Sequence, residues 1–473
     1  MTRMRLLLAV LLLVIASPIH PGAQAPAIDW AAVEAETMQH FQALLRFDTT
    51  DPPGREVEAA TYLKGVLERE GIPTTVVSKE DHRPNVIARL KGSGAKRPLL
   101  LMAHTDTVNV DPAKWTHPPF AAVREGGYVY GRGTLDDKDN VVAALMTMLL
   151  LKRTGLPLDR DVIFLAEAGE EGSTQIGIQF VVNEHYDLID AEYCLAEGGR
   201  VARQDGAVAF ASVQTLEKIP HRIELVATGP AGHGSVPLRT NAVVRLAKAV
   251  AAVADWKPEI RLNETTSTYF ERLAQISSAE AAPRYLSVLN PATVADADEY
   301  FLEHEPRHAS MLRTSVSPNI SNAGYRINVI PSDARASLDV RMLPDEDPQA
   351  FLQKVRDVVN DPAVEVSFGV RNIRPGGPLT RLDAEPFRAL EQAVREHYDG
   401  AVTLPTMSTG ATDMAYLRAK GMQCYGIGPA VDLEDEPKGF AAHSDQERIL
   451  EVELNRFVRF HWDVVARVAG AGH

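Results

Sequence analysis

The chain has 473 residues, of which 45% are hydrophobic and 24% are charged, a composition typical of a folded globular protein. This length exceeds what one ordinary hydrophobic core organises, so we expect two domains. The formal net charge of −14 argues against a nucleic acid as the partner, because phosphate binding needs a clustered cationic face.

Residues 1–25 are predicted to be a cleavable signal peptide. Arg3 and Arg5 precede an apolar run over residues 6–16, and residues 23–25 form a small-x-small cleavage site. The apolar run is shorter than the roughly 20 residues that span a bilayer, and we find no later segment that is apolar enough to span one. We therefore expect a secreted or periplasmic protein. An uncleaved membrane anchor is the alternative.

Helical and strand patterns alternate through the first half of the chain. This alternation predicts an α/β layer with a largely parallel sheet. The predicted helices cover residues 29–46, 55–70 and 140–153, and the predicted strands cover residues 85–90, 99–103, 162–166 and 191–195.

The pattern changes near residue 219. A strand, a helix, two strands, a helix and a strand follow, which is the order of the split βαβ unit in a ferredoxin-like domain. Residues 262–318 enlarge the middle of this unit and show little clear periodicity, and the α/β pattern resumes near residue 372. The predicted elements are strands at 221–228, 325–330, 334–342 and 363–368, and helices at 241–254, 347–359, 383–397 and 445–468.

These changes predict an inserted domain. We expect residues 26–218 and 372–473 to form one α/β catalytic domain, interrupted by an α+β domain over residues 219–371. The chain has only two cysteines, Cys194 and Cys424, so a disulfide framework is excluded. Both cysteines lie in apolar runs, and we expect buried free thiols, with one disulfide between them as the alternative.

Residues with acid or imidazole side chains follow several predicted strands. His104 and Asp106 come directly after the strand at 99–103. Residues two apart in an extended chain face the same way, so His104 can reach a metal while Asp106 reaches the other ring nitrogen. Further along, residues 131–138 hold glycines and two aspartates before a predicted helix. A carboxylate here can give one oxygen to each of two cations, or can simply cap the helix.

Glu170 and Glu171 follow the strand at 162–166. Adjacent carboxylates repel each other unless a cation or a proton compensates, so one can bind metal while the other takes a proton from water. A solvated acidic loop is the alternative. Glu197 at another strand end and His443 before the final helix complete the candidates. Together they supply two histidines and three carboxylates, a donor set that suits a pair of Zn²⁺ ions.

These motifs, in this order over essentially the whole mature chain, resemble the co-catalytic zinc exopeptidase family that includes aminoacylase, carboxypeptidase G, carnosinase and succinyl-diaminopimelate desuccinylase. Residues 115–120 and 232–237 are most similar to its secreted branch of Gly-Xaa carboxypeptidases and N-acyl-amino-acid hydrolases. The resemblance implies a metallopeptidase or amidohydrolase with a zinc-exopeptidase-like α/β domain and an inserted ferredoxin-like domain for dimerisation or as a lid. It also implies two Zn²⁺ per subunit, with Co²⁺ or Mn²⁺ as possible substitutes.

The resemblance further implies a cis peptide between Asp136 and Asp137. Two small departures from the family pattern are Ala196, where an aspartate often precedes the glutamate, and Asp139, where glycine or asparagine is common. Neither removes a ligand, although both affect the expected metal affinity and loop shape. In the roles that the resemblance implies, His104 and Glu197 bind one zinc ion, Glu171 and His443 bind the other, and Asp136 bridges the two ions. Asp106 orients His104, and Glu170 acts as the general base.

In the inserted domain, the resemblance implies that His233 donates to the reaction's oxyanion. It also implies that this histidine serves the partner subunit's metal centre in a homodimer. Asn328 and Arg341 match a pair in the family, and Arg341 is suited to a bidentate grip on a substrate α-carboxylate. Gly410 and Thr412 lie in a turn that resembles the family's substrate-side turn, whose backbone amides could also meet a carboxylate.

We therefore expect zinc-dependent hydrolysis of a peptide or N-acyl amide bond next to a free carboxylate. The acyl side stays open between a dipeptide, a longer peptide and a fatty-acyl amino acid. One alternative is an aminopeptidase-type di-zinc exopeptidase that reads a free amine. The other is a non-catalytic binding or structural protein on the same scaffold, which two bound metal equivalents without turnover would favour.

Overall fold

The computed structural model describes residues 28–370 and 374–472, so the predicted signal peptide lies outside the described residues. Within them, ten strands form a main sheet in the order β1-β2-β6-β3-β7-β17-β9-β8-β18, with β16 also paired to β9. The strands are β1 (Thr74–Ser78), β2 (Pro84–Leu90), β3 (Leu99–His104), β6 (Val162–Glu167), β7 (Tyr193–Ala196), β8 (Arg200–Gln204), β9 (Ala207–Glu217), β16 (Thr403–Ser408), β17 (Gln423–Gly426) and β18 (Ala430–Asp432).

Helices cover both faces of this main sheet. Leu99 and Leu101 pack on one face with α1, α2, α3, α12 and α14, whereas Leu100 and Met102 pack on the other with α4 and α13. A parallel strand that is buried on both faces has a continuous run of apolar residues, and this run is what predicts β3 from the sequence. The strands β6, β3, β7 and β17 are parallel, so the predicted α/β layer is confirmed.

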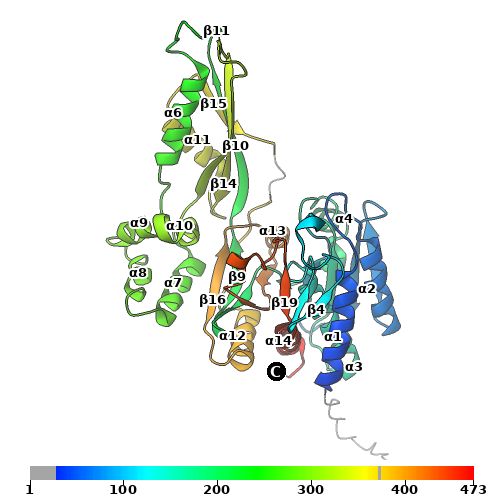
Figure 1. Cartoon of the computed structure of the whole chain (residues 1–473). Coiled ribbons are helices and arrows are strands. Elements are labelled where there is room, and N and C mark those ends of the chain that lie inside the picture. The colour runs from blue at the N-terminus through cyan, green and yellow to red at the C-terminus, as the bar shows by residue number, and fades with distance from the viewer. Residues whose placement is uncertain (1–27, 371–373, 473) are drawn as a thin grey trace, which may run out of the picture.

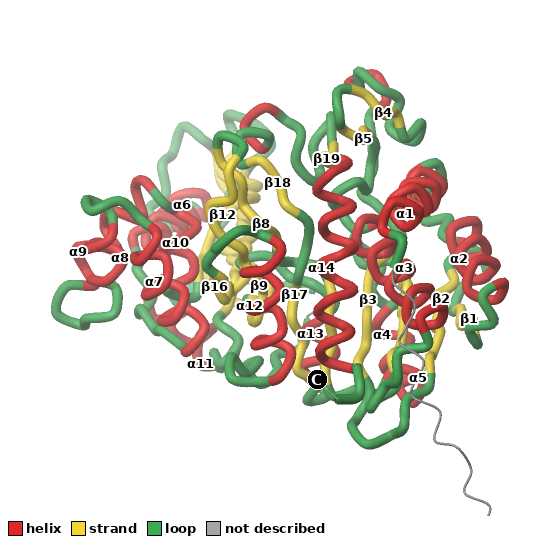
Figure 2. Tube along the Cα trace, turned by 90° about the horizontal axis from the view of Figure 1, so that it is seen from below, coloured by secondary structure: helices red, strands yellow, loops and turns green. Residues whose placement is uncertain are grey.

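Figure 2 shows α14 and α3 lying along the sheet, with α1 beside α3. The helices of the two faces are α1 (Trp30–Leu45), α2 (Val57–Arg69), α3 (Lys138–Thr154), α4 (Ile178–Glu184), α5 (Tyr186–Ile189), α12 (Glu385–His397), α13 (Met414–Ala419) and α14 (Glu451–Ala469).

A second sheet stands above the main one in Figure 1. Its strands β10 (Ile219–Thr228), β12 (Ser315–Ala323), β14 (Asp333–Met342) and β15 (Val364–Phe368) are arranged in the order β12-β14-β10-β15, and all neighbours are antiparallel. Helices α6 (Ala242–Asp255) and α11 (Pro348–Val359) pack their apolar residues against it. This order is that of two interlocked split βαβ units, so the ferredoxin-like fold is confirmed.

The strand predicted over residues 325–330 is wrong. The second strand of this sheet is β12, and only β13 (Val329–Ile330) forms further on, paired with β11 (Gly232–His233). The error has a physical cause, since β12 is an edge strand with almost all of its residues exposed and a proline at position 318. Such a strand needs no apolar alternation, whereas Ile327, in the middle of the predicted strand, is fully exposed.

Residues 262–318 also contain four helices that the sequence did not reveal. These are α7 (Glu264–Ile276), α8 (Ala282–Ser287), α9 (Val294–His304) and α10 (Pro306–Met311). Phe270 and Phe301 stack at the centre of their core, which also includes Leu404 and Met407 of β16. The four helices therefore cover the outer end of the main sheet, to the left in Figure 1. The domain boundaries at residues 219 and 371 stay predictions.

Cys194 and Cys424 lie opposite each other on β7 and β17 as buried free thiols, as predicted. A small sheet beside the body joins β4 (Val123–Glu125), β5 (Tyr128–Tyr130) and β19 (Arg448–Leu450). In the part of the chain that the structure describes, no helix has the length and hydropathy needed to cross a membrane.

Candidate metal centre

Three neighbouring strands end beside one another at the candidate site. Strand β3 ends at His104, β6 leads into the loop that carries Glu170 and Glu171, and β7 ends one residue before Glu197. These strands are parallel neighbours, so their carboxyl ends lie at the same edge of the sheet, where α/β folds place ligand sites. His443 joins them from the loop before α14.

Asp136 lies between the two histidines. Its Oδ1 is 2.9 Å from Nε2 of His104, and its Oδ2 is 2.9 Å from Nε2 of His443. Nε2 of His443 is also 3.1 Å from Oε1 of Glu171, and Nε2 of His104 is 4.0 Å from Oε2 of Glu197. One carboxylate thus presents a separate oxygen to each histidine, which is the geometry needed to bridge two cations.

Two groups of described residues offer ligand atoms within 4.8 Å of one another. One contains His104, Asp136 and Glu171, and the other contains His104, Glu170 and Glu197. The predicted pairing assigned His104 to one ion only and made Glu170 the base. In the structure, His104 takes part in both groups, and Glu170 lies close enough to be a ligand. His443 connects through its contacts with Asp136 and Glu171. Imidazole and carboxylate donors of this kind fit divalent transition metals such as Zn²⁺.

The electrostatics of the cluster favour cations. Burial raises the pKa of Glu170 to about 7, even though Nη2 of Arg374 lies 2.8 Å from its Oε1. Burial and the neighbouring Glu170 raise the pKa of Glu197 well above its usual range. Contacts with Asp136 and Glu171 raise the pKa of His443 to about 10. Carboxylates this crowded need protons or positive charge beside them, and bound cations would supply that charge.

Asp106 holds the loop that carries the two glutamates. Its side chain accepts hydrogen bonds from the backbone N–H groups of Gly169 (2.8 Å), Glu170 (3.2 Å) and Glu171 (3.0 Å). Nδ1 of His104 is 3.6 Å from Oδ1 of Asp106 but 3.1 Å from its backbone carbonyl oxygen. The carboxylate therefore fixes the loop directly, and the histidine ring is held at least as closely by the backbone of Asp106.

A buried glutamate that sequence reasoning missed supports the loop before Asp136. The carboxylate of Glu447 accepts from the backbone N–H groups of Gly133 (3.2 Å) and Leu135 (2.7 Å) and from Nη1 of Arg132 (2.6 Å). Glu447 is more than 300 positions away in sequence, so no local motif could have revealed it. The predicted cis peptide between Asp136 and Asp137 is present.

The residues predicted in the inserted domain do not join the cluster within one chain. His233 lies on β11 at the far tip of the upper domain, beside β13 and the exposed Asn328 (Figure 1). Arg341 on β14 makes a bidentate ion pair with Asp339, with distances of 2.9 and 3.1 Å. The roles of these residues stay predictions.

The predicted substrate-side turn has its donors engaged. The backbone N–H and the hydroxyl of Thr412 donate to Oε2 of Glu217 at 2.7 and 2.8 Å, and the backbone N–H of Gly410 donates to the hydroxyl of Ser408. Glu217 is buried and also accepts from Arg418 at 3.0 Å. The turn is thus held in place by Glu217 and Ser408.

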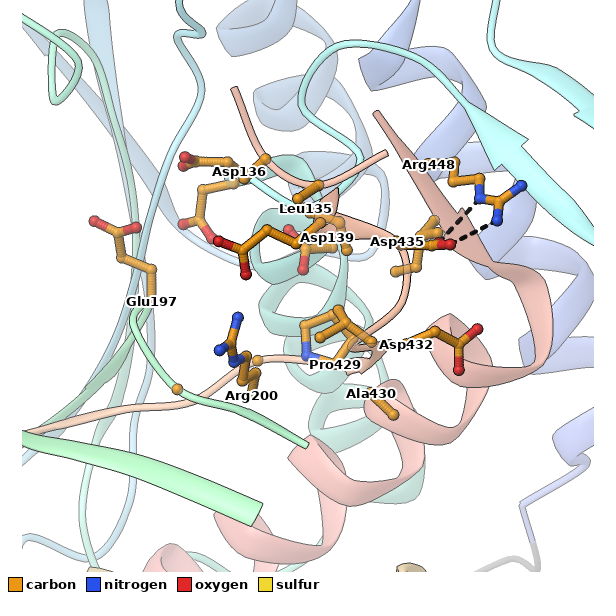
Figure 3. A pocket seen from close by; sticks show the side chains of 18 of the residues that line it. Leu135, Asp136, Asp139, Glu197, Arg200, Pro429, Ala430, Asp432, Asp435 and Arg448 are labelled. Atoms are coloured by element: carbon orange, nitrogen blue, oxygen red, sulfur yellow. Dashed lines mark hydrogen bonds and ion pairs between the residues drawn. The ribbon is translucent and has the colours of Figure 1, made fainter. Parts of the chain in front are cut away.

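A pocket of about 310 Å³ adjoins the cluster (Figure 3). Asp136 and Glu197 form one end of it, and Arg200 and Arg448 are among the charged residues further in. We call it the metal-side pocket. Its presence beside the predicted ligands gives a substrate group room next to the metal centre.

Comparison with known proteins identifies the family to which the chain belongs. Residues 100–467 match the family described as "Peptidase family M20/M25/M40". The chain is 29% identical over 378 residues to "Probable carboxypeptidase S-like 2" of Dictyostelium discoideum, covering 78% of this chain and 71% of that protein. It is 27% identical to a human protein named "N-fatty-acyl-amino acid synthase/hydrolase", covering 78% of this chain and 74% of the relative.

Solved structures show the same fold. An M20 family metallo-carboxypeptidase from Sulfolobus solfataricus aligns with a TM-score of 0.67 and 20% identity, covering 92% of this chain and 99% of that one. A dinuclear metal-binding peptidase from Bacillus subtilis aligns with a TM-score of 0.59 and 16% identity, with coverage of 92% and 99%. With the family match spanning most of its length, this chain is a hydrolase of peptide or amide bonds and belongs to peptidase family M20/M25/M40.

Proposed function

We propose that the protein is a zinc-dependent hydrolase of a peptide or N-acyl amide bond next to a free carboxylate. The observation that carries this proposal is Asp136, which offers one oxygen to each of two histidines while Glu170 lies beside them. The names of the relatives, a carboxypeptidase and an N-fatty-acyl-amino acid hydrolase, support the substrate class.

In this proposal His104 and Glu197 hold one cation, Glu171 and His443 hold a second, and Asp136 contacts both. Two bound Zn²⁺ ions would polarise the scissile carbonyl and lower the pKa of the attacking water. Co²⁺ or Mn²⁺ would serve as substitutes with the same nitrogen and oxygen donors.

Glu170 would move the protons. As general base it takes a proton from the attacking water and then passes that proton to the leaving nitrogen. Its carboxylate is buried and lies beside His104 and Glu197, so it is placed to accept a proton next to the proposed cations and to release it again. Arg374, at 2.8 Å, limits the directions in which the carboxylate can point.

His233 is prepared to donate to an oxyanion. The backbone N–H of Ser235 donates to Nδ1 of His233 at 3.1 Å, so Nδ1 carries a lone pair and, in the neutral ring, the proton resides on Nε2. This N–H would stabilise the developing oxyanion. Because the tip of the upper domain is remote from its own metal centre, we propose that His233 acts on the partner subunit of a homodimer (Figure 1).

The remaining predicted residues would hold the free carboxylate and shape the site. Nη1 of Arg341 is not used in its ion pair with Asp339, so it can still donate to a substrate α-carboxylate. Arg341 lies opposite Pro220 at the base of β10, whereas Asn328 lies beside His233 at the far tip and would act together with His233. The turn with Gly410 and Thr412 would line the region of the α-carboxylate. Residues 1–25 would direct the protein to secretion or to the periplasm.

The test is a hydrolysis screen of the mature protein with Zn²⁺, Co²⁺ or Mn²⁺, which compares Gly-Xaa dipeptides with N-acyl amino acids. Glu170→Gln should lower turnover by about 10²–10⁴-fold while metal content stays the same. Near-normal turnover by this variant would show that Glu170 is not the base. Two metal equivalents without hydrolysis of any amide would favour a binding protein instead.

A further inference from the structure

The metal-side pocket contains an arginine without a partner. Arg200 is the first residue of β8, and Figure 3 shows its guanidinium group pointing toward the end of the pocket formed by Asp136 and Glu197. Only its backbone takes part in hydrogen bonds, with Ser212. Among the residues that the structure describes, the guanidinium group makes no hydrogen bond and no ion pair.

The other arginines of this pocket are paired. Arg448 makes two contacts with Asp435, at 3.0 and 2.7 Å, and stacks on the ring of Tyr128. Arg307 is exposed at the rim, 4.0 Å from Glu436. Burial, followed by the positive charge of Arg307, lowers the pKa of Arg200, although a guanidinium group stays charged in proteins. The guanidinium group of Arg200 is therefore a positive charge without a paired carboxylate, although carboxylates also line the pocket, and a bound anion would pair with it.

The backbone fixes Arg200 relative to the metal centre. Only two glycines separate it from Glu197. Gly198 has a φ of +107°, and a Cβ on Gly199 would lie 2.3 Å from the backbone oxygen of Gly426. Larger residues do not fit this tight passage between β7 and β8. Glu197 and Arg200 thus face the same pocket at a set separation, one as a proposed metal ligand and the other as a free cation.

The other residues that line the metal-side pocket suit a short acyl chain that ends in a charged group. The lining of the pocket also includes apolar residues, among them Ile427, Pro429 and Ile449. A long alkyl chain in this pocket would have to cover the guanidinium group of Arg200, and burying an unpaired charge is costly. A short acyl chain that ends in a carboxylate would place its methylene groups on the apolar wall and its charge on Arg200.

We propose that the metal-side pocket is an anion subsite, in which Arg200 binds a carboxylate of the substrate through paired N–H···O hydrogen bonds. This proposal rests on the proposed amide hydrolysis at the adjoining metal centre. The carboxylate has two possible sources. One is a second acid on the acyl group, and the other is the α-carboxylate of the amino acid, in which case Arg200 would hold it in place of Arg341.

The experiment compares N-succinyl and N-butyryl derivatives of the same amino acid, since these acyl groups match in chain length and differ in the terminal carboxylate. Wild type, Arg200→Met and Arg200→Lys are measured for KM, kcat and metal content. The control is Arg203→Met, three residues further along β8, because Arg203 is already paired with Glu453 at 3.2 Å. Binding of succinate and of butyrate to the metal-loaded proteins is measured separately by thermal shift.

We expect Arg200→Met to raise KM by about 10–100-fold with little change in kcat, the range expected for hydrogen bonds to a charged group. Arg200→Lys should keep part of the affinity, and Arg203→Met should behave as wild type. A KM effect confined to the succinyl substrate identifies the acyl carboxylate, and an equal effect on both substrates identifies the α-carboxylate. The stabilisation by succinate beyond that by butyrate should also disappear in Arg200→Met if the acyl carboxylate is bound.

Two results would overturn the subsite. One is an unchanged KM for both substrates in Arg200→Met, and the other is a fall in kcat that accompanies loss of metal, which would make Arg200 a structural counter-charge. If wild type hydrolyses neither substrate, the proposed function fails on its own. The thermal shifts then decide the subsite. If the shift by succinate and the shift by butyrate are each the same in Arg200→Met as in wild type, the subsite is refuted.

Discussion

The substitution Asp106→Asn tests how the protein positions the loop that carries Glu170 and Glu171. Asp106 is fully buried, and its carboxylate accepts three backbone N–H groups from residues 169–171. Asparagine keeps one carbonyl oxygen, which can retain the two amides on Oδ1. Its NH₂ group would then face the amide of Glu171, so that two donors meet and neither finds an acceptor.

The expected loss of stability follows from these contacts. An unsatisfied buried polar group costs about 1–3 kcal/mol, and the two remaining hydrogen bonds lose the negative charge that strengthened them. We expect the metal-free protein to lose about 3 kcal/mol of its free energy of unfolding. Typical domains have about 5–15 kcal/mol in total, so the variant should still fold. Because the loop carries Glu170 and Glu171, metal affinity should fall by about 10–100-fold.

Denaturant unfolding with a chelator present gives the stability, and metal titration gives the affinity. Asp111→Asn is the matched control, since Asp111 is exposed and caps a short 3₁₀ helix (Pro112–Lys114) through Ala113. The control should leave metal affinity unchanged. If Asp106→Asn stays within about 0.5 kcal/mol of wild type and binds metal equally well, the carboxylate does not hold the loop as we argue.

Three further predictions follow from other parts of the structure. His461 is buried beside Thr147, and burial lowers its pKa from 6.5 to about 3, so the unfolded chain gains a proton first as the pH falls. Between pH 7.5 and 5, wild type should lose about 2 kcal/mol more stability than His461→Gln, and equal pH dependence in urea unfolding would contradict the burial argument. Mixing His233→Ala with Glu170→Gln subunits should restore up to about a quarter of wild-type activity, because half of the random dimers are mixed and each mixed dimer has one complete site of two. No recovery despite confirmed subunit exchange would rule out a shared site. Glu447→Gln should cost about 3 kcal/mol of stability by leaving a buried arginine without its anion, which thermal unfolding at constant pH would measure, and an unchanged Tm would disprove it.

The parts of the fold that the sequence predicted are those with strong local patterns. Strand β3 is an unbroken apolar run because helices cover both of its faces, and the candidate ligands were visible because they follow such strands. Strand β12 gave no signal because an exposed edge strand needs no apolar face. Helices α8 and α10 have only six residues each, too few for a helical period to stand out.

The candidate site residues that could be predicted are likewise those with a local sequence pattern. His104, Asp136 and His443 could be proposed from their motifs and from the family resemblance, whereas Glu447 acts on residues that are distant in sequence. The ion pair between Arg132 and Glu447 joins positions 315 apart. Only the folded chain shows that such residues meet, so their contribution could not be read from local sequence.

The short connection between the two sheets means that a small rotation at its base moves the tip of the upper domain by a large distance. Strands β9 and β10 are separated by one residue, Lys218, whose buried ammonium group donates to the backbone oxygen of Ser310 at 2.8 Å and to the hydroxyl of Ser315 at 2.9 Å. The ten residues of β10 form an arm of about 33 Å that carries β11 at its far end. A pivot of about 10° at Lys218 would swing His233 by about 6 Å, twice the length of a hydrogen bond. In the proposed homodimer, the position of that imidazole relative to the second subunit would therefore depend on how firmly Ser310 and Ser315 hold Lys218 at the base of the arm.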